Sequence, residues 1–203
     1  MLMQYAKNLL FPLLLLFWLF CLPLAFAIYS PVLYQSNCHW NERCVQLGEQ
    51  GVEQRTGELN RFFLHRLDVL PSPWTNKENR HLQEVRTIYD GVFLLFALIS
   101  VVFVLDWLIS KDPRRNYTNY SRNALFISVG LLLAVVLIAP FFNSFWIKVF
   151  HPLLFDNELW RTDPRDISWY LMPKAFFLRV IVFICGVTLL LNAVLWGVLK
   201  RRY

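Results

Sequence analysis

The chain has 203 residues, 57% of them hydrophobic, and a formal net charge of +6. Soluble domains use only about 45–50% apolar residues, so this composition excludes an ordinary soluble protein and indicates that lipid surrounds part of the chain. The positive charge does not indicate nucleic acid, because the basic residues collect beside apolar runs and form no extended basic face.

Four segments are long and apolar enough to cross a bilayer, which takes about 20 mostly apolar residues in a helix. They are residues 9–29, 88–109, 124–142 and 175–199. The first partly resembles a secretory signal peptide, because Lys7 precedes it and Ala25-Phe26-Ala27 resembles a cleavage site. Its apolar run exceeds the core of about 7–15 residues in such a peptide, so we favour an uncleaved spanning helix.

The charges that flank these segments predict the orientation. Basic residues gather at the N-terminus, between the second and third segments and at the C-terminus. The other two connections, residues 30–87 and 143–174, balance seven basic against seven acidic residues and four against four. We therefore expect both termini in the cytoplasm, and both connections, with all four histidines, outside. The predicted fold is all-α: a single membrane domain over residues 1–203, with a four-helix transmembrane bundle and amphipathic outer-surface helices.

The first outer segment, residues 30–87, combines a cysteine pair with two helical signals. Cys38 and Cys44 lie where an oxidising environment permits a disulfide, and two unpaired thiols are the alternative. Apolar residues recur at helical spacing over residues 52–69, which predicts an amphipathic helix at the interface. Thr75 and Glu78 have the spacing of a capping box, so a helix should start at Thr75 and continue into the second span.

The second outer segment, residues 143–174, should lie along the membrane surface. Asn143 or Ser144 can cap a short helix that ends at His151, just before a break at Pro152. The run from Asp163 to Asp166 has an N-cap residue followed by a proline, which predicts another helix start. Tryptophan and tyrosine are frequent here, as expected at lipid headgroups; they are Trp146, Trp160, Trp169 and Tyr170.

Two of the histidines are the candidate catalytic residues, because an unperturbed imidazole has a pKa of about 6.5 and carries protons near neutral pH. His81 shares a helix face with Glu78, and Glu84 lies beside it. Each could also be structural: His81 as an interfacial residue, Glu78 as a cap, Glu84 as a partner of Arg80. A metal site is a further alternative, because Glu78 and His81 have i, i+3 ligand spacing. The segments contain no nucleophile motif and no phosphate-binding glycine loop.

At its two histidine segments the sequence resembles the bacterial lipoprotein intramolecular transacylase (Lit) family of membrane proteins. The first motif reads E-x-x-H-L-x-E-V from Glu78 to Val85, with Glu84 where the family has aspartate. The second comprises Phe150-His151, Phe155, Trp160, Asp166, Pro173 and Phe176-Phe177. The cysteine pair is not part of the family pattern.

The resemblance implies an acyl transfer within one lipoprotein molecule, at the outer leaflet of the bacterial cytoplasmic membrane. The sn-2 acyl chain of a diacylglyceryl cysteine would move to the α-amine of that cysteine and leave a lyso-form lipoprotein. The two catalytic histidines of the family correspond to His81 and His151. The reaction needs no cofactor, because converting an ester to an amide is downhill.

The residues are consistent with this chemistry. An α-amine with a pKa of about 7.7–8.0 must lose a proton before it attacks, and a neutral imidazole can take it. We expect His81 to be the base, oriented by Glu84 or Asp166, and His151 to polarise the ester or share the proton transfer. Trp160 and Arg179 are candidate binding residues, although Arg179 could instead reach the headgroups. Two other functions remain open: a non-catalytic membrane partner subunit and a metal-dependent lipid-modifying enzyme.

Overall fold

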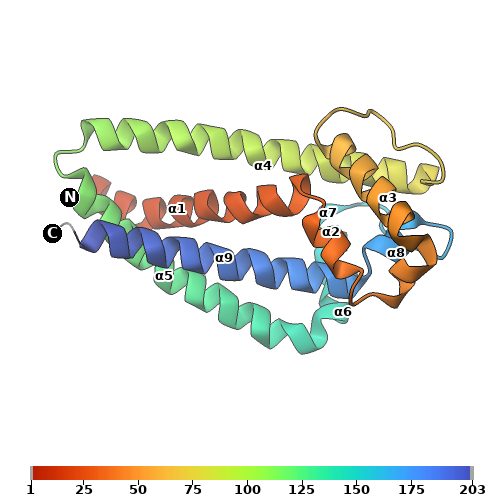
Figure 1. Ribbon diagram of the computed structural model, residues 1–203. Helices are drawn as coiled ribbons and strands as arrows, with labels where there is room; N and C mark the ends of the chain where they lie inside the picture. The colour runs from red at the N-terminus through yellow and green to blue at the C-terminus, as the bar shows by residue number, and fades with distance from the viewer. Residues whose placement is uncertain (1, 202–203) are drawn as a thin grey trace. The chain divides into compact units, whose positions relative to one another are not determined.

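The structure is a computed structural model that describes residues 2–201, with side chains from Lys7 onward, and within this range all its regular elements are helices. The all-α prediction is confirmed. In chain order the elements are α1 Leu2–Tyr29, α2 Val32–Asn37, η1 Glu42–Leu47, α3 Gly48–Phe63, α4 Asn76–Ile109, α5 Pro113–Ile138, η2 Ala139–Phe141, α6 Phe142–Phe145, η3 Trp146–Phe150, α7 His151–Leu154, α8 Ile167–Leu171 and α9 Lys174–Lys200 (Figure 1).

Four of the helical stretches are long and apolar enough to cross a membrane, as predicted. They comprise Lys7–Tyr29, Asn76–Ile109, Pro113–Leu154 and Lys174–Lys200. The helix α4 is much longer than the roughly 20 residues that a bilayer core needs. Its apolar run occupies the C-terminal part, so the polar N-terminal turns, which carry His81, precede that run.

The chain divides into two compact units, and residues of each of the four long helices belong to both. We name them the helix unit and the site unit and describe each separately. The helix unit comprises Met1–Leu24, Asp90–Leu137 and Val182–Tyr203. The site unit comprises Ala25–Tyr89 and Ile138–Ile181.

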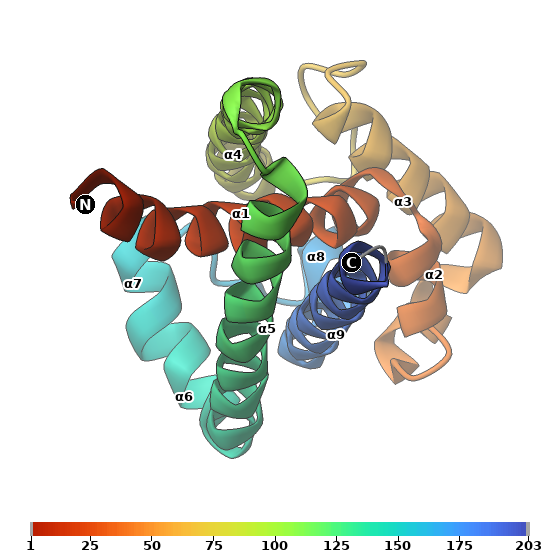
Figure 2. The same cartoon turned by 90° about the vertical axis from the view of Figure 1, so that its left-hand side faces the viewer.

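The helix unit is held together by an aromatic and aliphatic core. Its buried centre contains Phe11, Leu15, Leu19, Tyr117 and Tyr120. The start of α1, the α4–α5 connection and the end of α9 lie at one end of this unit (Figures 1 and 2). The predicted basic flanks, which include Lys7, Lys111 and Lys200, are therefore at the same end. There Lys7 forms an ion pair with the buried Asp106 at 2.8 Å.

In the site unit, the predicted amphipathic helix is α3, which starts and ends earlier than expected. Leu59, Phe62 and Phe63 on its apolar face are buried. The helix ends because His65 adopts a positive φ of 56°, and the Arg66 N–H bonds back to the Arg61 carbonyl at 2.8 Å. This is the Schellman ending of a helix, although glycine is the usual residue at the left-handed position. The apolar spacing over residues 52–69 did not reveal this terminator.

Candidate active site

The N-terminus of α4 is fixed by the predicted capping box. The Thr75 N–H donates to Glu78 Oε2 at 2.9 Å, and the Glu78 N–H donates to Thr75 Oγ1 at 3.2 Å. The other carboxylate oxygen of Glu78 accepts from both the N–H and the hydroxyl of Ser168, each at 2.7 Å. The buried Glu78 is therefore a cap that also joins α4 to α8.

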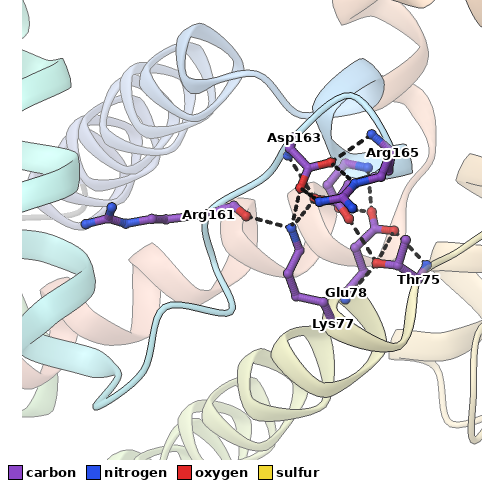
Figure 3. A network of polar contacts seen from close by, with 8 residues as sticks. Thr75, Lys77, Glu78, Arg161, Asp163 and Arg165 are labelled. Atoms are coloured by element: carbon purple, nitrogen blue, oxygen red, sulfur yellow. Dashed lines mark hydrogen bonds and ion pairs between the residues drawn. The ribbon is translucent and has the colours of Figure 1, made fainter.

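A second polar network ties the chain before α8 to the same end of α4 (Figure 3). Lys77 Nζ lies 2.5 Å from Asp166 Oδ2 and 3.3 Å from Asp163 Oδ2, and it donates to the Arg161 carbonyl at 2.9 Å. The Thr75 hydroxyl donates to the remaining oxygen of Asp166 at 2.9 Å. Asp166 is almost completely buried, so these donors stabilise a carboxylate that has lost its water. The network fixes residues 161–166 against the N-terminus of α4.

The predicted helix start at Asp163 is three residues too early, since α8 begins at Ile167. Residues around Pro164 instead form a turn, in which Asp163 Oδ1 accepts from the Arg165 N–H at 2.9 Å. The Arg165 guanidinium, together with Lys77, holds the pKa of the Asp163 carboxyl well below its usual range. Asp163 therefore caps the turn before α8 and not the helix itself.

His151 lies on a helical stretch that continues through Pro152 to Leu154. The expected helix end before Pro152 is therefore wrong. The expected cap at Asn143 or Ser144 is wrong as well, because helical residues precede both positions and no side chain caps the helix there.

A π-helical turn at Trp146–Phe150 explains how the helix passes the proline. Within it the His151 N–H bonds to the Trp146 carbonyl, five residues back. Pro152 then occupies the first turn of the next α-helical stretch, where its missing N–H is tolerated. Turns of this kind are frequent at functional sites.

The same turn fixes the side chain of His151. Its Nδ1 lies 2.8 Å from the Trp146 carbonyl oxygen. Because a carbonyl only accepts, Nδ1 carries the hydrogen and Nε2 of the neutral ring keeps its lone pair. The residue is 5% exposed. Trp160 stacks on it at 4.3 Å between centroids, and Trp146 meets it edge-on at 4.6 Å.

The structure brings the two predicted histidines together. The centroids of His81 and His151 are 6.3 Å apart, and both rings line one cavity of about 760 Å³ within the site unit. Phe155 packs edge-on against His81 at 4.8 Å and also contacts His151. Most other wall residues are apolar, so the cavity suits a lipid chain as well as a polar reacting group.

Glu84 lies beside His81, with Oε2 3.6 Å from Nδ1. Its other oxygen accepts from Asn157 Nδ2 at 2.9 Å, and the Asn157 carbonyl accepts from the Trp160 indole at 2.8 Å. Asn157 thus links Glu84, which lies beside His81, to Trp160, which stacks on His151. Asn157 was missed by the sequence analysis, because a single asparagine in a loop has no pattern that indicates its partner.

The other predicted site residues lie elsewhere. Asp166, the second candidate to orient His81, bonds to Thr75 and Lys77 as described above. Arg179 is exposed, and its guanidinium donates to the Asn37 side chain at 3.2 Å. Cys38 and Cys44 form a disulfide, one of the two states expected. Among residues 2–201, no three histidine, cysteine or acidic side chains gather as a set of metal ligands.

Comparison with known proteins identifies similar sequences and structures. A family model described as lipoprotein intramolecular transacylase Lit matches residues 9–177. Comparison with curated proteins finds no match.

Among solved structures, a Bacillus cereus lipoprotein intramolecular transacylase Lit is similar at a TM-score of 0.76 and 20% identity, with 98% of this chain and 97% of that one covered. Two variants of the Bacillus protein, with one histidine replaced by arginine or by alanine, give TM-scores of 0.77 at 19% identity and cover 98% of this chain and 93% of theirs.

Proposed function

Because the chain belongs to the lipoprotein intramolecular transacylase Lit family, we propose that it moves the sn-2 acyl chain of a diacylglyceryl lipoprotein to the α-amine of the N-terminal cysteine. The product is a lyso-form lipoprotein. The observation that carries this proposal is the pair of imidazoles, His81 and His151, on the wall of one largely apolar cavity.

The reaction balances without a second substrate. The neutral amine nitrogen attacks the ester carbonyl carbon, a C–N bond forms, and the C–O bond to the glycerol breaks. The proton that leaves the nitrogen ends on the glycerol oxygen. Because the amine and the ester belong to one molecule, holding them in contact supplies a large rate advantage; effective molarities reach about 10⁵–10⁸ M in favourable cases.

His81 is the base of this reaction in our proposal. When its ring takes the proton of the amine, the imidazolium charge forms 3.6 Å from the Glu84 carboxylate, which stabilises it. The same ring then returns the proton to the departing glycerol oxygen. Asn157 holds the carboxylate for this role through its hydrogen bond to Glu84.

His151 assists this proton transfer by orienting the amine and does not polarise the ester. Its Nδ1 hydrogen is committed to the Trp146 carbonyl, which leaves Nε2 as an acceptor. An acceptor can bind the second N–H of the attacking amine and orient it. Two imidazolium charges 6.3 Å apart would repel one another, so the pair functions with one added proton.

The four apolar helices place the enzyme in a membrane. We assign it to the bacterial cytoplasmic membrane, with both termini in the cytoplasm and the histidine cavity at the outer leaflet. The support is the basic end of the helix unit, which contains the start of α1, the α4–α5 connection and the end of α9.

The test is mass spectrometry of the N-terminal lipopeptide of a lipoprotein from bacteria with and without this protein. Expression should convert the free amine to an amide and reduce the glycerol to one acyl chain. His81→Ala and His151→Ala should each abolish the conversion, whereas His65→Asn should not, because His65 is an exposed histidine at a positive φ that asparagine tolerates. Full conversion by folded His81→Ala would instead favour a non-catalytic partner subunit.

A further inference from the structure

The C-terminus of α8 is capped by side chains from a distant segment. The last carbonyl groups of a helix have no partner within it. Here three consecutive carbonyls accept from three side chains of residues 37–43: Leu171 from Asn37 at 3.0 Å, Tyr170 from Asn41 at 2.5 Å and Trp169 from Arg43 at 3.4 Å. The short η1 packs against α8 in the same region.

The disulfide closes the loop that carries these donors. Cys38 directly follows Asn37, and the buried Cys44 directly follows Arg43. The bridge therefore joins the two ends of the capping segment, with 5.2 Å between the Cα atoms. It restricts the conformations available to Arg43 by restricting those of the loop.

Arg43 faces the histidine cavity. Its guanidinium lies 3.7 Å from the centre of the Trp169 ring, and both residues line the cavity. A guanidinium has five N–H donors, of which the Trp169 carbonyl takes one. The ion pairs found among the described residues do not include Arg43. Its other donors are therefore available to a ligand.

The charges of the wall favour a ligand with acceptor oxygens. Besides the two histidines, the charged lining residues are Arg43, Arg161 and Lys174, all of them basic. Arg161 pairs with Glu158, and Lys174 is exposed. Arg43 remains as a half-buried cation with a planar set of donors, which suits carbonyl or carboxylate oxygens.

We propose that Arg43 is a substrate-binding residue that donates hydrogen bonds to carbonyl oxygens in the peptide segment of the lipoprotein, and that the Cys38–Cys44 disulfide presents it to the cavity. This rests on the proposed acyl transfer. The guanidinium of Arg43 contacts α8, whereas His81 contacts Phe155 in the loop after α7, and His151 contacts the π-helical turn and Trp160 in the same loop. Arg43 therefore holds a part of the substrate that does not react.

The test compares two substrates with the purified, oxidised protein: a diacylglyceryl-cysteinyl peptide of several residues and diacylglyceryl-cysteine alone. Arg43→Gln should raise KM for the peptide about ten-fold, or about 1.4 kcal/mol, with little change in kcat. KM for the single amino acid should not change. Arg43→Lys should recover part of the lost affinity, because lysine keeps the positive charge but lacks the planar set of donors of a guanidinium. The matched control is Arg66→Gln, an exposed arginine that does not line the cavity.

A second arm tests the disulfide. The Cys38→Ser, Cys44→Ser double variant should show the same rise in KM for the peptide, and adding Arg43→Gln should then cause no further rise. An unchanged KM for folded Arg43→Gln, an equal loss with both substrates, or independent effects of Arg43→Gln and the cysteine variant would overturn this inference alone. Absence of acyl transfer by the wild-type protein would overturn the proposed function itself.

Discussion

The Glu84→Gln variant isolates the charge that supports His81. Glutamine keeps the length and shape of the side chain, and its amide oxygen can still accept from Asn157. What changes is the negative charge 3.6 Å from His81 Nδ1, which in the proposed reaction faces a developing imidazolium. The variant should therefore slow the chemical step and leave lipid binding intact.

The size of the effect follows from the distance and the exposure of the pair. At 3.6 Å, Coulomb's law gives about 5 kcal/mol at an effective dielectric constant of about 20, and about 1 kcal/mol in water. The Glu84 side chain is 37% exposed and that of His81 17%, so water screens part of the interaction. We expect a loss of about 2 kcal/mol, which corresponds to a fall in kcat of about 30-fold.

The assay is the initial rate of acyl transfer by purified protein on a synthetic diacylglyceryl-cysteinyl peptide, followed by mass spectrometry. Glu53→Gln is the matched control, because Glu53 is an exposed glutamate on α3 that does not line the cavity. KM should be similar for all three proteins. A Glu84→Gln rate equal to that of the wild type, or an equal loss in Glu53→Gln, would refute the role of the carboxylate.

Variants at three further residues test the supports of the site. Glu78→Gln should lower the free energy of unfolding by about 1–3 kcal/mol, because an amide NH₂ would face buried donors, and an unchanged melting temperature would contradict this. Trp160→Leu should lower kcat about ten-fold by releasing His151, whereas Trp160→Phe should retain most activity; equal rates for both would show that stacking is irrelevant. The folded pKa of Asp163 is depressed by Arg165, so its stabilisation is complete above about pH 4 and is lost as pH falls further. The melting-temperature difference between wild type and Asp163→Asn should shrink below that pH; a constant difference would oppose it.

Local patterns predicted the parts of the site that depend on neighbouring residues. The capping box fixed the start of α4, because Thr75 and Glu78 are three residues apart and bond to each other. Hydropathy identified the four spanning helices because this signal is also local: each segment makes its backbone hydrogen bonds within itself. Because the start of α4 was predicted correctly, His81 and Glu84 could be placed three residues apart on neighbouring turns of one helix.

Partners that are distant in the sequence could not be predicted. Asn157 reaches Glu84 across 73 positions, and no spacing rule links them. Asp166 was a candidate partner of His81, but its carboxylate pairs with the ammonium group of Lys77, 2.5 Å away. Pro152 predicted a helix end, because proline removes an N–H; the π-helical turn before it removed that conflict.

The central claim is that His81, assisted by His151, transfers the proton for an acyl shift within a single lipopeptide. The most direct measurement mixes two diacylglyceryl-cysteinyl peptides, one of which carries isotopes in both its sn-2 chain and its peptide, with the purified protein. Mass spectrometry should find amides only between a labelled chain and a labelled peptide, or an unlabelled chain and an unlabelled peptide, and no amide with His81→Ala or His151→Ala. Mixed products from the wild type, or undiminished product from either folded variant, would contradict the claim.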